Sequence, residues 1–262
     1  MTRPPRFLQR TLRAPRAARI ICCGLLITLW QPAHAQHAPS VNTIEKIDVS
    51  VAQRDENLLA YTVTELYRLF RNGDRVRPAA EMTVKTTYRR DTGKSFVILT
   101  QSGSAFLLKE VLGRVLDSER LMTQPDNRRQ ALLTSSNYNM RVKGGVTVEG
   151  HACTVVSIVP KRSSPYLFRG DIWVDSEDGS ILKLEGVASK SASVLTGAAQ
   201  VSRRYEKIQG LPMATHAGAT AVSWLLGETI IDIDYSDYQM TLRTAAGAAP
   251  PPGQAASTGS NE

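Results

Sequence analysis

Two clusters of acidic residues are the part of this sequence best suited to chemistry. In the first, Asp175, Glu177 and Asp178 lie close together, and their carboxylate oxygens are the hard ligands that calcium prefers. The segment is much shorter than the roughly 12-residue loop of an EF-hand. It ends in Asp178-Gly179, a pair typical of tight hairpin turns. We therefore expect a hairpin tip here and no metal site.

The second cluster consists of Asp232, Asp234 and Asp237 and could supply carboxylates for acid–base catalysis. Alternation with Ile231 and Ile233 places Asp232 and Asp234 on the outward face of the last strand, where solvated charges protect a sheet edge. We expect such an edge here. A hydrolase acting through Asp234 is the weakest of the functions considered.

Other signatures of enzymes are missing from the sequence. The histidines beyond residue 35, namely His37, His151 and His216, are not spaced as in His-Glu-x-x-His, and neither a G-x-S-x-G elbow nor a phosphate-binding G-x-x-x-x-G-K-[ST] loop occurs. Cys153 lies in the strand-like run HACTVVSIV, which favours a small buried hydrophobe over a reactive thiol. We expect no enzyme activity, no catalytic residue, no metal and no cofactor.

The first 35 residues have the three-part layout of a secretory signal peptide. Six arginines and no acidic residue precede an apolar run from Ile20 to Trp30, and Ala33-His34-Ala35 supplies a small-x-small cleavage site. The alternative is an uncleaved membrane anchor, but the run is only about half of the roughly 20 residues that span a bilayer. The sequence thus predicts cleavage near Ala35 and a periplasmic protein.

Removal of this leader changes the charge balance. The chain has 32 Lys and Arg residues against 24 Asp and Glu, and losing the six leader arginines leaves 26 against 24. No run of basic residues with interleaved aromatics remains, so we expect no nucleic-acid partner.

The remaining sequence predicts helices at two places in a long series of strands. An amphipathic helix is expected from Thr43 to about Asn57, a second from Gly103 to Met122, and a short third over residues 126–136. Alternation of apolar and polar residues predicts about eleven strands, namely 58–71, 81–89, 95–101, 138–143, 146–149, 151–159, 166–175, 180–189, 199–208, 211–225 and 228–240. The run Phe96–Leu99 predicts a central strand covered on both faces, and Gly144-Gly145 predicts a turn.

Short turns between successive strands make neighbouring strands antiparallel. A single antiparallel sheet of this length must curl, because twist accumulates from strand to strand. The expected fold class is therefore mainly β (α+β), with the helical segments lying as a lid on an apolar concave face. Residues 36–243 form the predicted domain, and residues 244–262, rich in Ala, Pro, Gly and Ser, form a predicted disordered tail.

One hairpin in this order of elements carries a family resemblance. Residues 170–186, GDIWVDSEDGSILKLEG, follow an N-terminal helix, three strands and a helical insertion. The pattern, from about Thr43 to Met240, resembles the LolA/LolB-like outer-membrane lipoprotein-sorting family. The resemblance implies an unclosed barrel with helices over its open side, and an apolar interior that holds acyl chains of lipoproteins or other lipids. The alternative that it implies is a periplasmic sensor or protein-interaction domain, because relatives use the same fold as a sensor domain.

We expect the residues that line an apolar cavity to be those given by alternation and helical spacing. They are Tyr61, Val63, Tyr67, Met82, Val84, Tyr88, Phe96 and Ile98 from the strands, with Leu108, Val111, Leu112 and Val115 from the lid. The same stripes could instead pack together as a filled core. The expected partners of the monomer are lipid or lipoprotein acyl chains and membrane-associated donor and acceptor proteins. Trp173 marks either a partner surface or a side chain packed under a loop.

Overall fold

The computed structural model describes residues 40–148, 150–164, 166–190, 198–223 and 227–243. The predicted signal peptide and C-terminal tail lie outside these residues. The helices are α1 (Ser40–Asn57), α2 (Ala105–Leu107), the π-helical turn η1 (Leu108–Gly113), α3 (Arg114–Thr123) and α4 (Pro125–Ala131). The strands are β1 (Leu58–Arg71), β2 (Ala80–Arg89), β3 (Gly93–Gly103), β4 (Tyr138–Val148), β5 (His151–Pro160), β6 (Phe168–Asp175), β7 (Ile181–Ala188), β8 (Gln200–Ile208), β9 (Leu211–Ser223) and β10 (Gly227–Leu242).

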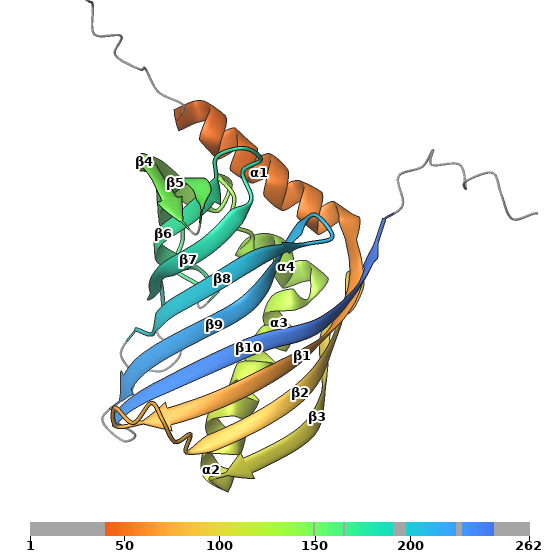
Figure 1. Cartoon of the computed structure of the whole chain (residues 1–262), viewed down its shortest axis with the longest axis vertical. Helices are drawn as coiled ribbons and strands as arrows, with labels where there is room; N and C mark the ends of the chain where they lie inside the picture. The colour runs from red at the N-terminus through yellow and green to blue at the C-terminus, as the bar shows by residue number, and fades with distance from the viewer. Residues whose placement is uncertain (1–39, 149, 165, 191–197, 224–226, 244–262) are drawn as a thin grey trace, which may run out of the picture. The chain divides into compact units, whose positions relative to one another are not determined.

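These ten strands form one antiparallel sheet in the order β3-β2-β1-β10-β9-β8-β7-β6-β5-β4. Sequence neighbours pair along the sheet, and the first and last strands, β1 and β10, pair with each other near its centre. The chain passes from one edge to the other, from β3 to β4, through α2, η1, α3 and α4 (Figure 1). The predicted single open sheet with a helical insertion after the third strand is therefore confirmed. No helix within the described ranges has both the length and the apolar character needed to cross a bilayer.

The sheet has ten strands rather than about eleven, because two predicted strands are one. Residues 138–143 and 146–149 were expected to be separated by a turn at Gly144-Gly145. Both glycines lie inside β4, where the pairing with β5 shifts by one residue between Val142 and Gly144. The glycine pair therefore marks a bulge, which is a common role for glycine within a strand.

The third strand is at an edge of the sheet, so the prediction of a central, covered strand was wrong. Val97, Ile98 and Leu99 in β3 are 63, 50 and 54% exposed. A second shift in register, between Thr83 and Val84 in the β2–β3 pairing, interrupts the alternation within this run. An apolar run shows that a strand tolerates burial on both faces, but only the pairing decides whether neighbours cover it.

Two clusters of buried side chains fill parts of the face that the helices cover. The lid core lies under α2, η1 and α3 and consists of Tyr67, Leu69, Ala80, Met82, Val84, Leu107, Leu112, Leu116, Ala217, Ile231 and Ile233. The α1 core consists of Ile47, Tyr138, Val156, Ile158, Leu167, Ile172, Val174, Ile181 and Leu184. Each core buries the apolar stripe of one helical segment against one half of the sheet, which is the main source of stability in such an arrangement.

The tip of the β6–β7 hairpin supports α1. Gly179 has a φ of +78°, and a Cβ atom on it would lie 2.4 Å from the carbonyl oxygen of Lys46. The Nζ atom of Lys46 in turn donates to the carbonyl oxygen of Ser176 at 2.9 Å. Asp175 and Asp178 each pair with Lys207 at 2.8 Å. The acidic cluster of the sequence is thus the predicted hairpin tip, held by a cation from β8.

The two faces of β6 differ as the alternation predicts. Ile172 and Val174 are buried in the α1 core, whereas Trp173 is half-buried on the opposite face. The Nζ atom of Lys183 lies 4.5 Å from the centre of the Trp173 ring, a cation–π contact across the hairpin. Cys153 is buried as predicted, and burial raises the pKa of its thiol.

Candidate functional site: a cavity beside the lid core

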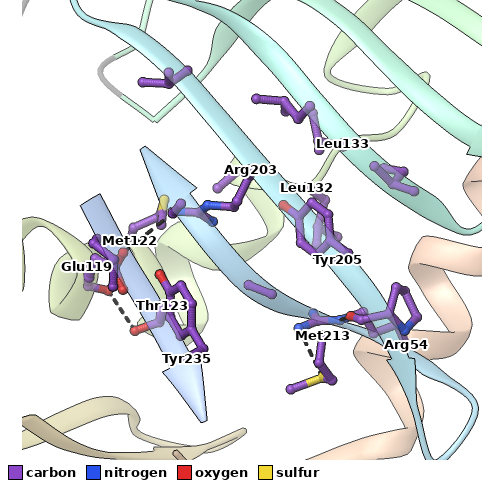
Figure 2. Close-up of a pocket in the computed structure, with 18 of the residues that line it drawn as sticks. Arg54, Glu119, Met122, Thr123, Leu132, Leu133, Arg203, Tyr205, Met213 and Tyr235 are labelled. Atoms are coloured by element: carbon purple, nitrogen blue, oxygen red, sulfur yellow. Dashed lines mark hydrogen bonds and ion pairs between the residues drawn. The ribbon is translucent and has the colours of Figure 1, made fainter. Parts of the chain in front are cut away.

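A cavity of about 350 Å³ lies where the two cores leave the covered face of the sheet unfilled. Its walls come from α1, α3 and α4, from the segment after α4, from strands β6 to β10, and from the start of β1, the end of β2 and the start of β3. Figure 2 shows Glu119 of α3, Arg203 of β8 and Tyr235 of β10 directed into the same space. The volume lies near the lower end of the roughly 300–1,000 Å³ that is usual for small-molecule sites.

Much of the wall is apolar or aromatic. Leu132 and Leu133, which follow the short helix α4, belong to this part of the wall. Pro125 lies in the first turn of α4, and this proline ends the preceding helix α3. Further apolar and aromatic side chains in the wall are Val51, Leu58, Val115, Met122, Phe168, Ile181, Leu184, Val201, Tyr205, Met213, Ala217, Ala219, Ile231 and Ile233. Small residues of β9, Ala217 and Ala219, leave the space that larger side chains would fill.

A group of buried charges forms another part of the wall. Lys94, at the start of β3, contacts Glu65 at 3.3 Å and also pairs with Glu119 of α3. The second oxygen of Glu119 lies 3.6 Å from Arg203. Glu65 is fully buried behind the wall and accepts a hydrogen bond from the hydroxyl of Tyr67. Buried charges of this kind are tolerated only when they are paired and hydrogen-bonded.

Opposite charges nearby favour the charged forms of Lys94 and Glu119. Burial disfavours the ammonium of Lys94, but the carboxylates around it, Glu119 foremost, outweigh burial and raise its pKa well above the ordinary value. Burial likewise disfavours the carboxylate of Glu119, but Lys94 and Arg203 outweigh burial and lower its pKa. Burial itself, together with the neighbouring Glu119, raises the pKa of the Tyr235 hydroxyl well above its usual range.

A second charged group lies at the end of α1. Asp55 pairs with Arg128 of α4 at 2.9 Å and with Arg90 at 3.7 Å. Arg128 also donates to the hydroxyl of Tyr88 at 3.0 Å and to the carbonyl oxygen of Arg90 at 2.7 Å. These contacts tie the C-terminal end of α1 to α4 across the cavity wall.

The structure places only part of the predicted lining in this cavity. Tyr61, Tyr88 and Val115 line it, and the rings of Tyr61 and Tyr88 stack with centres 5.0 Å apart. Seven others belong to the lid core or pack against it, namely Tyr67, Met82, Val84, Phe96, Leu108, Val111 and Leu112. Val63 is fully buried, and Ile98 is half exposed at the edge of the sheet. The space under α2 and η1 is therefore filled by the lid core, and the cavity lies beside it, against α3.

Sequence reasoning missed the buried charges, although one signal was present. Glu65 occupies the same parity in β1 as Val63 and Tyr67, so it is an acidic residue on the apolar face. Such a residue requires a cation nearby. Its partner Lys94 lies outside any periodic pattern and could not be identified before the β2–β3 pairing was known.

On the other face of the sheet, the aspartates of β10 are not at an edge, which corrects the sequence prediction. The strand lies between β1 and β9. Asp234 pairs with Arg68 and lies 2.8 Å from the Nδ1 atom of His216. Charge on a central strand is thus matched by partners on both neighbouring strands. Within the described parts of the chain, no group of three His, Cys, Asp or Glu residues is arranged to hold a metal ion.

Comparisons with known proteins give distant similarities of fold. No family model matches the chain, and no curated protein matches it in sequence. An outer membrane lipoprotein-sorting protein domain from Vibrio parahaemolyticus is similar in structure, with a TM-score of 0.43 and 13% identity over 74% of this chain and 91% of the other. A DUF1329 family protein from Desulfovibrio piger gives a TM-score of 0.40 and 13% identity, covering 77% of this chain and 93% of the other.

A third solved structure belongs to the family that the hairpin resembles. It is a LolA superfamily protein from Nitrosomonas europaea, with a TM-score of 0.37 and 13% identity over 77% of this chain and 93% of that one. The structures similar to this chain thus include the LolA superfamily.

Proposed function

We propose that this chain is a periplasmic carrier that shelters an acyl chain of a lipid or lipoprotein in the cavity between its helices and its sheet. In this proposal residues 1–35 are removed on export, and residues 36–243 act as a monomeric half-barrel domain. The carrier receives its cargo from a membrane-associated donor and delivers it to an acceptor. No chemical step is required, because holding and releasing the cargo is the whole function.

The observation that carries the proposal is a hollow of about 350 Å³ beside a well-packed core. A protein of this size could fill such a space with larger side chains, yet β9 supplies Ala217 and Ala219 there. Interiors are normally packed without voids of this size. A hollow whose wall is largely aliphatic and aromatic is suited to a hydrocarbon chain.

The energetics are adequate for a carrier. Each buried methylene contributes about 0.8 kcal/mol, so sheltering a 16-carbon chain contributes on the order of 10 kcal/mol before ordering costs. A free acyl chain in water lacks this stabilisation. Reversible binding follows if part of this free energy is offset when the chain and the wall become ordered.

Filling the hollow should test the proposal directly. Ala219 of β9 lines the cavity, so Ala219→Trp places an indole in the space that an acyl chain would occupy. We expect this variant to lose at least about tenfold in affinity for a palmitoyl ligand, since most of the buried methylene contacts become unavailable. Displacement of a neutral naphthylamine dye from the purified protein measures the affinity.

Val222→Trp is the matched control, because Val222 lies on the same strand and is 62% exposed. It should bind the palmitoyl ligand as the unmodified protein does. Equal affinities for the two tryptophan variants would exclude the cavity as the binding site. Mass spectrometry of the native protein, purified without detergent, should in addition show a bound lipid that the Ala219→Trp variant lacks.

A further inference from the structure

Arg54 is the cation of the cavity wall that lacks an acidic partner. It lies in the last turn of α1 and is half-buried. Its Nε atom donates to the carbonyl oxygen of Pro212 at 2.9 Å, and its Nη2 atom lies 3.8 Å from the sulfur of Met213. Among the described residues, no carboxylate lies within ion-pair distance of its guanidinium. Figure 2 shows Arg54 beside Met213 at the cavity.

The other three cations of the wall are each matched by carboxylates. Lys94 has Glu65 and Glu119, and Arg203 shares Glu119. Arg128 has Asp55, as described above. Every cation of the wall except Arg54 thus has a carboxylate within ion-pair distance, although Arg128 shares Asp55 with Arg90.

A guanidinium keeps its charge in any protein environment, so Arg54 cannot escape this situation by losing a proton. The carbonyl oxygen of Pro212 and the end of the α1 dipole offer only partial negative charge. A thioether is a weak acceptor, so the contact with Met213 uses little of the bonding capacity of Nη2. An anion bound here would form charge-assisted hydrogen bonds, which are about twice as strong as neutral ones.

The surroundings of Arg54 suit the junction between a head group and a hydrocarbon chain. Leu58, Tyr88 and Met213 form one buried cluster next to it, and Tyr61 and Tyr238 pack against this cluster. The wall continues into the aliphatic and aromatic residues already described. A ligand with one charged end and one chain would thus meet Arg54 at its charged end and the apolar wall along its length.

We infer that the cavity selects a single-chain anionic amphiphile, whose carboxylate or phosphate ester binds the Arg54 guanidinium while its acyl chain occupies the apolar wall. The inference rests on the proposed function, and it names the class of cargo. One chain is favoured over several because the volume of about 350 Å³ is small for a ligand site. The anionic oxygens match the planar fork of the guanidinium, which can bind two of them at once.

The test compares ligands that share a palmitoyl chain and differ in the head group. Palmitate and palmitoyl lysophosphatidic acid carry anionic heads, and monopalmitoylglycerol carries a neutral one. Each displaces the neutral naphthylamine dye from the unmodified protein and from the Arg54→Gln variant. We expect both anionic ligands to bind about tenfold more tightly than the neutral one, as a charge-assisted pair of hydrogen bonds implies. Arg54→Gln should abolish this preference and change the affinity for monopalmitoylglycerol less than about twofold.

Lys46→Gln is the matched control, since it removes a cation from the same helix at a position outside the cavity wall. It should keep the preference for anionic heads. Arg54→Lys retains the positive charge but lacks the planar guanidinium, and it should keep part of the preference for anionic ligands. Such a result would show that replacing Arg54 does not by itself disrupt the fold, so the loss of preference in Arg54→Gln would report the loss of charge. Whichever of the two anionic ligands binds with the higher affinity shows whether a carboxylate or a phosphate is the natural head group.

Two results would overturn the inference. Equal binding of anionic and neutral ligands by the unmodified protein, or an unchanged preference in Arg54→Gln, would remove the head-group role of Arg54 and leave the acyl carrier intact. Failure of all three ligands to displace the dye would instead reject the proposed function, and the inference with it.

Discussion

At the scale of single residues, the charges inside this fold are its most demanding feature. Glu65 and Glu119 are at most 7% exposed, and both depend on Lys94 for compensation. Replacing Lys94 by Met leaves two carboxylates buried close together with only Arg203 nearby. We expect Lys94→Met to lower the free energy of unfolding at neutral pH by about 3–5 kcal/mol, the usual cost of removing one partner of a buried pair. Urea unfolding followed by circular dichroism measures the change.

The same residues give a dependence on pH whose sign can be worked out. The pKa of Glu119 is lowered in the folded state, so its ion pairs stabilise the fold above the ordinary value of 4.5. That contribution is lost as the pH falls through the lowered value. The unmodified protein should therefore lose stability on acidification below about pH 4.5. In Lys94→Met only Arg203 remains beside the buried carboxylate of Glu119, so acidification should restore stability, and a parallel fall in both proteins would contradict this account.

At the scale of elements, the contact between the β6–β7 hairpin and α1 depends on Gly179. A methyl group there would be strained by the positive φ and would also collide with the backbone of Lys46. Gly210 offers a matched control, because its φ of +80° is similar and a Cβ atom on it would meet nothing within 4 Å. We expect Gly210→Ala to cost about 1–2 kcal/mol from backbone strain alone. Gly179→Ala should cost a further 1–3 kcal/mol, roughly the cost of overpacking.

Hydrogen exchange measures where that cost falls. The amides of α1 should exchange faster in Gly179→Ala, because the helix loses its support at the hairpin tip, whereas Gly210→Ala should leave them unchanged. Equal effects of the two substitutions on stability and on α1 exchange would show that the close approach to Lys46 is unimportant.

The same elements show how far a sequence predicts a fold of this kind. Helix α1, the hairpin at 170–186 and most strands follow from periodicity and turn residues, which are local properties of the chain. The places of β3 and β10 do not follow, because pairing between distant segments decides which strands form the edges. The charged group around Lys94 was unpredictable for the same reason. A pattern gives the face of a residue but not its partner.

At the scale of the whole described domain, the helices and the sheet form two packed cores, with a cavity between them, on one continuous sheet. The lid core fixes α2, η1 and α3 on β1, β2 and β10, and the α1 core fixes the other half. Between them, the cavity has walls from both cores. Stability and ligand binding should therefore depend on different residues, even though all of them lie on one face of the sheet.

Met82 allows this separation to be tested, because it is buried in the lid core and does not line the cavity. We expect Met82→Ala to lower the free energy of unfolding by about 2–5 kcal/mol, the usual cost of a cavity in a packed core. The affinity for a palmitoyl ligand should stay within about twofold of the unmodified protein while the variant remains folded. Lys85→Ala, on the other face of β2, should change neither quantity. A loss of affinity in Met82→Ala as large as that in Ala219→Trp would mean that the ligand enters the space filled by the lid core, and the separation of the lid core from the cavity would then be wrong.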